Sequence, residues 1–93
     1  MKKLAALVVD DERLARQRLT GMLAKYDNIE VVGEAFDVSS AKKSIEKLLP
    51  DIVFLDIQMP KKSGFDLINE TNFDGKYIFV TAFDEYAVKA FEV

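Results

Sequence analysis

Continuous apolar runs alternate with segments of helical period along this chain. The first run, Leu4–Val9, is apolar at every position, and residues 12–26 then place apolar side chains at helical spacing. A strand that is apolar throughout is typical of burial on both faces, as in a parallel sheet. Parallel neighbours must be joined by crossovers, which are usually helices, so the alternation predicts an α/β fold with helices on both faces of the sheet.

The same pattern continues to the last residue. Further strands are predicted over residues 29–36, 51–55 and 77–80. Helices are predicted over residues 12–26, from a cap at Asp37, Ser39 or Ser40 to Leu49 before Pro50, over 65–69 and over 84–92. The chain has no internal repeat and no low-complexity linker, so residues 1–93 are interpreted as one domain.

The helical stripes also predict which side chains face the core. For the first two long helices and the last one, these are Ala15, Leu19, Met22, Leu23, Tyr26, Ala41, Ile45, Leu48, Leu49, Ala87, Val88 and Phe91.

Composition excludes several classes of function. The chain carries 16 acidic and 13 basic residues, a net charge of −3, which argues against binding nucleic acid through these residues. It has no cysteine and no histidine, so thiolate sites and histidine bases are excluded. Oxygen ligands remain, which suit Mg²⁺, Mn²⁺ or Ca²⁺. The lack of cysteine favours the reducing cytoplasm, and no apolar run approaches the ~20 residues of a membrane span.

Polar groups follow three of the predicted strands. Asp10 and Asp11 follow the first strand, Asp56 follows the third, and Thr81 follows the fourth. Ligands of open α/β sheets bind beyond the carboxyl ends of the strands. If the first, third and fourth strands are neighbours, these groups converge in one crevice.

Caps and turns are the ordinary explanation for an aspartate after a strand, and Asp10 or Asp11 could cap the first helix. Caps do not explain two acids that face a third across adjacent strands, because clustered carboxylates repel one another unless a cation lies among them. We therefore favour a Mg²⁺ site. Such a site suits phosphoryl transfer, with Asp56 as a nucleophile that forms an aspartyl-phosphate. Two interpretations of Thr81 remain open. Its hydroxyl could donate a hydrogen bond to a phosphoryl oxygen, or it is a plain β-branched strand residue.

These residues resemble the receiver domain of bacterial two-component response regulators. The resemblance rests on Val8-Val9-Asp10-Asp11-Glu12, on residues 51–60 (DIVFLDIQMP), on Ser63-Gly64-Phe65 and on residues 79–82 (FVTA), in the family's order and spacing. It implies a flavodoxin-like, doubly wound parallel sheet with the strand order 2-1-3-4.

The resemblance also implies a role for each site residue. Asp56 would be the phosphoacceptor that a sensor histidine kinase phosphorylates, and Thr81 the switch hydroxyl. Mg²⁺ would be held by Asp10, Asp11, Asp56 and the backbone carbonyl of Gln58. Such a domain is a switch and not an enzyme, beyond self-phosphorylation from small phosphodonors and slow autodephosphorylation.

A finer resemblance points to the LytTR-type regulators. It rests on Ala15, Arg16 and Leu19 after the acidic residues 10–12, and on residues 82–92 (AFDEYAVKAFE). In LytTR-type proteins a DNA-binding domain follows the receiver. The complete protein would then regulate transcription and contact DNA only through a C-terminal domain outside residues 1–93.

Receivers of this family continue with a fifth strand, which carries an active-site lysine, and a fifth helix, and both are absent from residues 1–93. Lys61, Lys62 and Lys89 match that lysine by residue type only and are more simply interpreted as solvated surface charges. Without the last strand, an exposed apolar edge predicts self-association by strand exchange.

Two other functions fit part of the pattern. A haloacid-dehalogenase-type phosphatase also uses an aspartate nucleophile after a strand, but it needs an acid two residues later, where this chain has Gln58. A receiver that only binds other proteins is disfavoured by the intact acids Asp10, Asp11 and Asp56. The absent lysine keeps that second alternative open.

Overall fold

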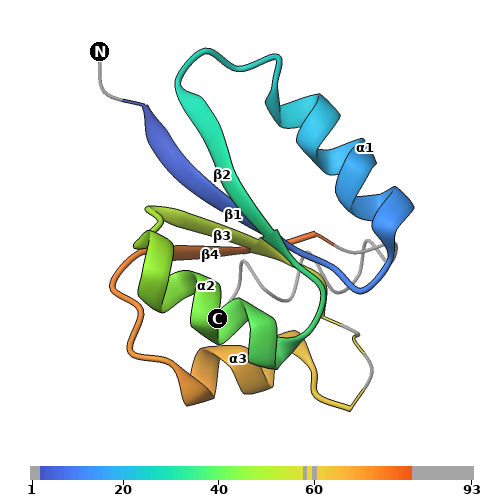
Figure 1. Ribbon diagram of the computed structural model, residues 1–93, viewed down its shortest axis with the longest axis vertical. Coiled ribbons are helices and arrows are strands. Elements are labelled where there is room, and N and C mark those ends of the chain that lie inside the picture. The colour runs from blue at the N-terminus through green and yellow to red at the C-terminus, as the bar shows by residue number, and fades with distance from the viewer. Residues whose placement is uncertain (1–2, 58, 60, 81–93) are drawn as a thin grey trace.

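Four parallel strands form the sheet in the computed structural model, which describes residues 3–57, 59 and 61–80 (Figure 1). The strands are β1 (Leu4–Val9), β2 (Ile29–Ala35), β3 (Ile52–Leu55) and β4 (Lys76–Phe79). Their order is β2-β1-β3-β4, which confirms the predicted flavodoxin-like sheet. The winding direction reverses between β1 and β3, and this switch point is where such folds bind ligands.

The helices cover both faces of the sheet. Helix α1 (Arg13–Leu23) lies on one face, and α2 (Val38–Leu48) and α3 (Gly64–Glu70) lie on the other (Figure 1). None of these three helices is long and apolar enough to cross a membrane.

The alternation of side chains along β1 separates two cores. Leu7 and Val9 pack in the larger core with α2 and α3, whereas Ala6 and Val8 pack with Leu23 of α1. All four β1 residues are at most 1% exposed. This burial on both faces explains why residues 6–9 of the first strand are all apolar, whereas Leu4 at the start of the strand is 40% exposed.

Local hydrogen bonds set the two ends of α2. Asp37 is the N-cap, because its Oδ1 accepts the backbone N–H of Ser40 at 2.7 Å, and Ser40 Oγ accepts the N–H of Asp37 at 3.2 Å. At the other end Leu49 adopts a left-handed conformation (φ 48°, ψ 57°) directly before Pro50. Among the three candidate caps, the structure thus selects Asp37.

Several predicted bounds shift by a few residues. Helix α1 begins after Glu12 and ends at Leu23 instead of residue 26. Strand β2 ends at Ala35, and β4 starts and ends one residue earlier than predicted. The helix predicted over residues 84–92, with Ala87, Val88 and Phe91, lies outside the described residues.

Four predicted core positions are wrong. Met22, Tyr26, Leu48 and Leu49 are 54%, 58%, 36% and 76% exposed. Tyr26 lies beyond the end of α1, and Leu49 is turned away from the core by its left-handed backbone. Met22 lines a groove beside Asp10 and Asp56, and Leu48 lies against Gly33 of the edge strand β2.

Candidate functional site

The acidic residues that follow β1 and β3 are anchored by continuation of the sheet's hydrogen bonds. The backbone N–H of Asp10 donates to the carbonyl of Ala35 at 3.0 Å, and that of Asp56 donates to the carbonyl of Val9 at 3.0 Å. Since β1 and β3 are adjacent, with Val9 paired to Leu55, these bonds place Asp10 and Asp56 side by side.

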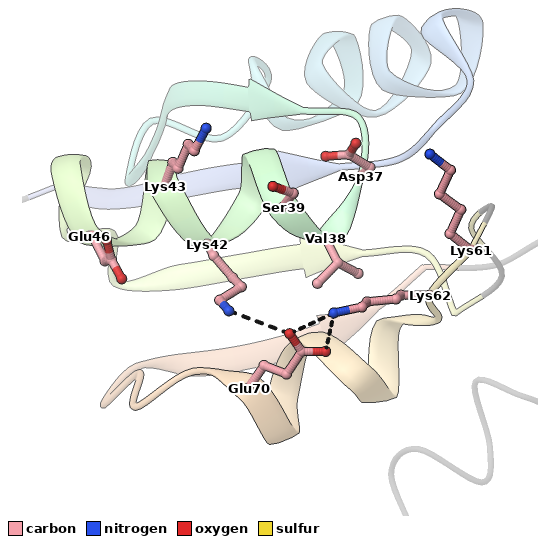
Figure 2. A pocket seen from close by; sticks show the side chains of 9 residues that line it. All are labelled: Asp37, Val38, Ser39, Lys42, Lys43, Glu46, Lys61, Lys62 and Glu70. Atoms are coloured by element: carbon pink, nitrogen blue, oxygen red, sulfur yellow. Dashed lines mark hydrogen bonds and ion pairs between the residues drawn. The ribbon is translucent and has the colours of Figure 1, made fainter.

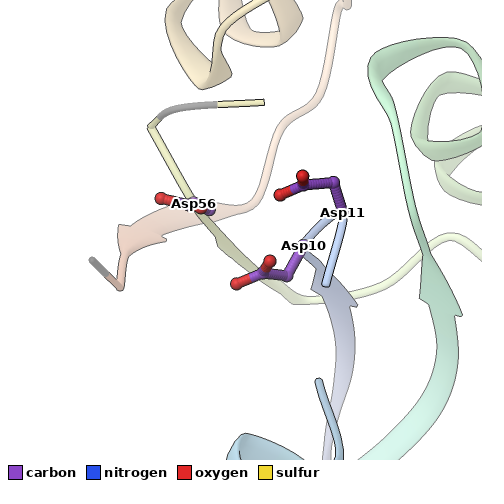
Figure 3. Close-up of side chains that lie close together, drawn as sticks. All are labelled: Asp10, Asp11 and Asp56. Carbon is purple, nitrogen blue, oxygen red and sulfur yellow. The ribbon is translucent and has the colours of Figure 1, made fainter. Parts of the chain in front are cut away.

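Three carboxylates converge at this end of the sheet (Figure 3). Asp10, Asp11 and Asp56 each offer an oxygen atom, and these atoms all lie within 4.8 Å of one another. Asp10 and Asp56 are half-buried, and Asp11 is exposed. The convergence that the strand ends predict is therefore present for all three acids.

The electrostatics of the cluster oppose its full ionisation. Burial raises the pKa of the Asp10 carboxyl, and the negative charges of Asp56 and Asp11 raise it further, against the hydrogen bond from the Glu12 N–H at 2.9 Å. A cation among the three carboxylates would relieve this repulsion. Three clustered carboxylates are also the kind of oxygen donor set that Mg²⁺ takes, so the residues present fit this ion.

Other predicted site residues are not all in the described part of the chain. Gln58, Thr81 and Lys89 lie outside the described residues. Lys61 and Lys62 are described, and both line a separate cavity between α2 and α3.

That cavity has a volume of about 420 Å³. Its lining carries both acidic and basic side chains (Figure 2). Within it, Glu70 accepts hydrogen bonds from Lys62 at 2.9 Å and from Lys42 at 3.4 Å. The bond from Lys62 is the main reason that the pKa of Glu70 is lowered. The groove beside the acidic cluster is smaller, about 290 Å³, and its lining combines charged and apolar side chains: Asp10, Glu12, Ala15, Arg18, Leu19, Met22, Asp56 and Val80. Convergent acids, and not cavity size, identify the candidate site.

Sequence reasoning did not assign a role to two residues that support the cluster. Arg16 of α1 donates from Nη1 to the backbone carbonyl of Asp10 at 2.7 Å and from Nε to Glu34 Oε1 at 3.1 Å. Gly64, which enters the sequence prediction only as part of the resemblance to receiver domains, packs directly against the backbone of Asp56. The placement of Arg16 on the first turn after two acids is the only signal in the sequence that hints at its contact with Asp10.

Comparison with known proteins gives a consistent match. The sequence model of the response regulator receiver domain matches residues 6–93. The transcriptional regulatory protein BtsR of Salmonella typhimurium is 48% identical over 88 residues, which cover 92% of this chain and 37% of that protein. The chain thus spans little more than a third of the length of this relative.

Solved structures agree with the fold. The response regulatory domain of protein mrkE from Klebsiella pneumoniae superposes with a TM-score of 0.78 and 33% identity, over 96% of this chain and 75% of that chain. The structure of the CheX-CheY-BeF3-Mg²⁺ complex from Borrelia burgdorferi matches with a TM-score of 0.78 and 28% identity, over 95% and 69% of the two chains.

Proposed function

The chain belongs to the response regulator receiver domain family, and from this premise we propose that it is a phosphorylation-controlled switch whose phosphoacceptor is Asp56. The observation that carries the proposal is the convergence of Asp56 with Asp10 and Asp11 at the switch point of the sheet. The donor of the phosphoryl group would be a phosphohistidine of a sensor histidine kinase.

Asp10, Asp11 and Asp56, with the backbone carbonyl of Gln58, would hold Mg²⁺. When bound, this ion neutralises charge on phosphoryl oxygens. The support from this chain is its oxygen-only donor set and the pKa of Asp10, which burial raises and which the negative charges of Asp56 and Asp11 raise further in the metal-free cluster.

In the proposed transfer, a carboxylate oxygen of Asp56 attacks phosphorus and forms a new P–O bond. The P–N bond to the donor imidazole breaks, and the imidazole leaves with the electron pair of that bond and takes up a proton from water. Thr81 would donate a hydrogen bond to a phosphoryl oxygen in the product. Hydrolysis of the acyl phosphate then returns the carboxylate, so the domain acts as a switch with only self-phosphorylation and slow autodephosphorylation of its own.

The complete protein is proposed to be a transcription regulator of the LytTR type, with DNA contacted through a further domain. The relative BtsR is named a transcriptional regulatory protein, which supports regulation of transcription. The LytTR type rests on the sequence resemblance alone, and self-association likewise stays a prediction.

The proposal is tested by phosphorylating the chain with acetyl phosphate and Mg²⁺ and measuring its intact mass. We expect the mass of one phosphoryl group to be added to the unaltered chain and to Asp74→Asn, a matched control at the opposite end of the sheet. Asp56→Asn should stay unlabelled with its fold retained. Normal labelling of Asp56→Asn would refute the assignment, and no labelling of the unaltered chain would favour a pure interaction module.

A further inference from the structure

Arg16 connects three elements behind the acidic cluster. Its guanidinium reaches from the first turn of α1 to the backbone carbonyl of Asp10, at the end of β1, and to the carboxylate of Glu34 in β2. The side chain of Arg16 is only 17% exposed, whereas that of Glu34 is 46% exposed. A long charged side chain that is mostly covered and makes two directed bonds is held in one conformation.

The contact with Asp10 fixes a particular peptide plane. The carbonyl oxygen that Arg16 holds at 2.7 Å belongs to the same planar unit as the backbone nitrogen of Asp11. Orienting this plane sets the direction in which the Asp11 side chain leaves the backbone. The other side of Asp10 is fixed by its N–H bond to Ala35, and its carboxylate by the N–H of Glu12.

Glu34 has a separate part in this arrangement. Its carboxylate accepts from Nε of Arg16, whereas the backbone carbonyl of Asp10 accepts from Nη1. The two acceptors are met by two different nitrogens of one rigid, planar group. A lysine ammonium is a compact charge on a flexible stem, so it cannot donate to both acceptors in this fixed planar geometry.

We propose that Arg16 is a positioning residue for the Mg²⁺ site: supported by Glu34, it orients the Asp10–Asp11 peptide so that the two carboxylates meet Asp56 around one ion. This inference rests on the proposed function, because it concerns the same metal site. Residues that orient metal ligands through hydrogen bonds typically change metal affinity by about 10- to 100-fold when they are replaced.

Simple electrostatics predicts the opposite change in Mg²⁺ affinity when Arg16 is replaced. Arg16 is a positive charge close to the site, so its removal by itself would make a divalent cation bind more tightly. A role in positioning predicts weaker binding instead. The sign of the change in Mg²⁺ affinity therefore separates the two roles, and a purely structural role would lower stability without changing affinity.

The test is a Mg²⁺ titration of the ¹⁵N-labelled chain, followed through the backbone amide signals. For Arg16→Gln we expect Mg²⁺ affinity to fall by about 10-fold, with shifted amide signals of Asp11 and Glu12 already in the metal-free protein. Arg16→Lys keeps the charge and should also bind Mg²⁺ more weakly. Arg13→Gln removes the same charge from an exposed position of α1 and should leave affinity unchanged or slightly higher.

The outcomes separate this inference from the function on which it rests. Unchanged or tighter Mg²⁺ binding by Arg16→Gln, with normal binding by the unaltered chain, overturns the role of Arg16 alone. Absence of Mg²⁺ binding by the unaltered chain overturns the metal site and this inference together. If Arg16→Gln does not fold, Glu34→Gln removes only the support of the guanidinium, and it should weaken Mg²⁺ binding less than Arg16→Lys does; unchanged affinity there counts against the proposal.

Discussion

A β-carbon on Gly64 would lie 2.6 Å from the backbone carbonyl oxygen of Asp56. The first residue of α3 therefore touches the backbone of the proposed phosphoacceptor, and its N–H donates to the carbonyl of Ile57 at 2.8 Å. Leu55 and Phe79 close the remaining space, at 3.0 and 3.2 Å from the same point. The absence of a side chain at position 64 is what allows α3 to pack against the end of β3.

Replacement of this glycine should displace the acceptor. For Gly64→Ala we expect a loss of about 1–3 kcal/mol in the free energy of unfolding, because the nearest atom is backbone and has little freedom to move. Urea unfolding measures the loss, and acetyl phosphate labelling should slow as Asp56 shifts. Gly21→Ala is the matched control: its added methyl group meets nothing within 4 Å in α1 and should stabilise by about 0.5–1 kcal/mol. If Gly64→Ala has the same free energy of unfolding as the unaltered chain, the loop after β3 can move aside at little cost.

Asp10 should make the metal-free protein less stable at neutral pH. Burial, with the charges of Asp56 and Asp11, raises the pKa of its carboxyl above the usual 3.8, so the folded state binds a proton more tightly than the unfolded state. Stability due to this group therefore rises as pH falls through the raised pKa and levels off below 3.8.

Asp10→Asn should accordingly raise the free energy of unfolding at pH 7 with chelator present, while its amide oxygen still accepts from the Glu12 N–H. This advantage over the unaltered chain should shrink as pH falls from 7 to 4, in urea titrations at each pH. Added Mg²⁺ should make the unaltered chain the more stable of the two, because the substitution removes a proposed ligand. An advantage that stays constant with pH would mean that ionisation of Asp10 is not its source.

The N-cap of α2 should show the opposite dependence on pH. The backbone N–H of Ser40 is the main cause of the lowered pKa of Asp37, and the Ser40 side chain adds to it. Its stabilisation is thus present above the usual 3.8 and is lost as pH falls below that value. We expect Asp37→Ala to melt at a lower temperature than the unaltered chain at pH 7, with Asp37→Asn between them. At pH 3 the difference in melting temperature between the unaltered chain and Asp37→Asn should be smaller than at pH 7. A larger difference at pH 3 would contradict the role of the Asp37 carboxylate as the cap.

The sequence predicted the strands and the acids at their ends because both follow from short-range patterns, whereas the strand order was implied by the resemblance to receiver domains. The unbroken apolar run Leu4–Val9 predicts a strand buried on both faces, and the structure gives the strand the same bounds and buries residues 6–9. Asp10 and Asp56 each come directly after a strand, so parallel pairing of β1 with β3 is enough to bring them together. No side-chain contact had to be known in advance.

Helix ends and supporting contacts were not predictable in the same way. An apolar stripe identifies the covered face of a helix but not the residue at which the helix stops, so Tyr26 and Leu49 were placed in the core by extending the stripe too far. The bond between Arg16 and Glu34 joins residues 18 positions apart on different elements, and no spacing in the sequence encodes it. The contact of Gly64 with Asp56 likewise depends on how closely α3 packs against β3.

The last prediction concerns Leu49, which ends α2 in a conformation that suits glycine. Its φ of 48° lies in the left-handed region, where a β-carbon costs about 1–2 kcal/mol, and its N–H donates to the carbonyl of Ile45 at 3.0 Å. With its side chain 76% exposed, Leu49 recovers little of this cost by burial. Leu49→Gly should therefore raise the free energy of unfolding by about 0.5–1 kcal/mol, after allowance for the greater freedom of glycine in the unfolded chain.

Lys47→Gly is the control, because position 47 is also exposed but has helical backbone in the last turn of α2. It should lose about 1 kcal/mol in the same urea titration. Opposite signs for one substitution at two positions two residues apart would show that backbone conformation, and not loss of a side chain, sets the effect. If both variants are destabilised, the side chain of Leu49 contributes more than its exposure suggests. Leu49 lines the cavity of about 430 Å³ between α2 and the residues after α3, so the source would then be packing against other residues of that lining.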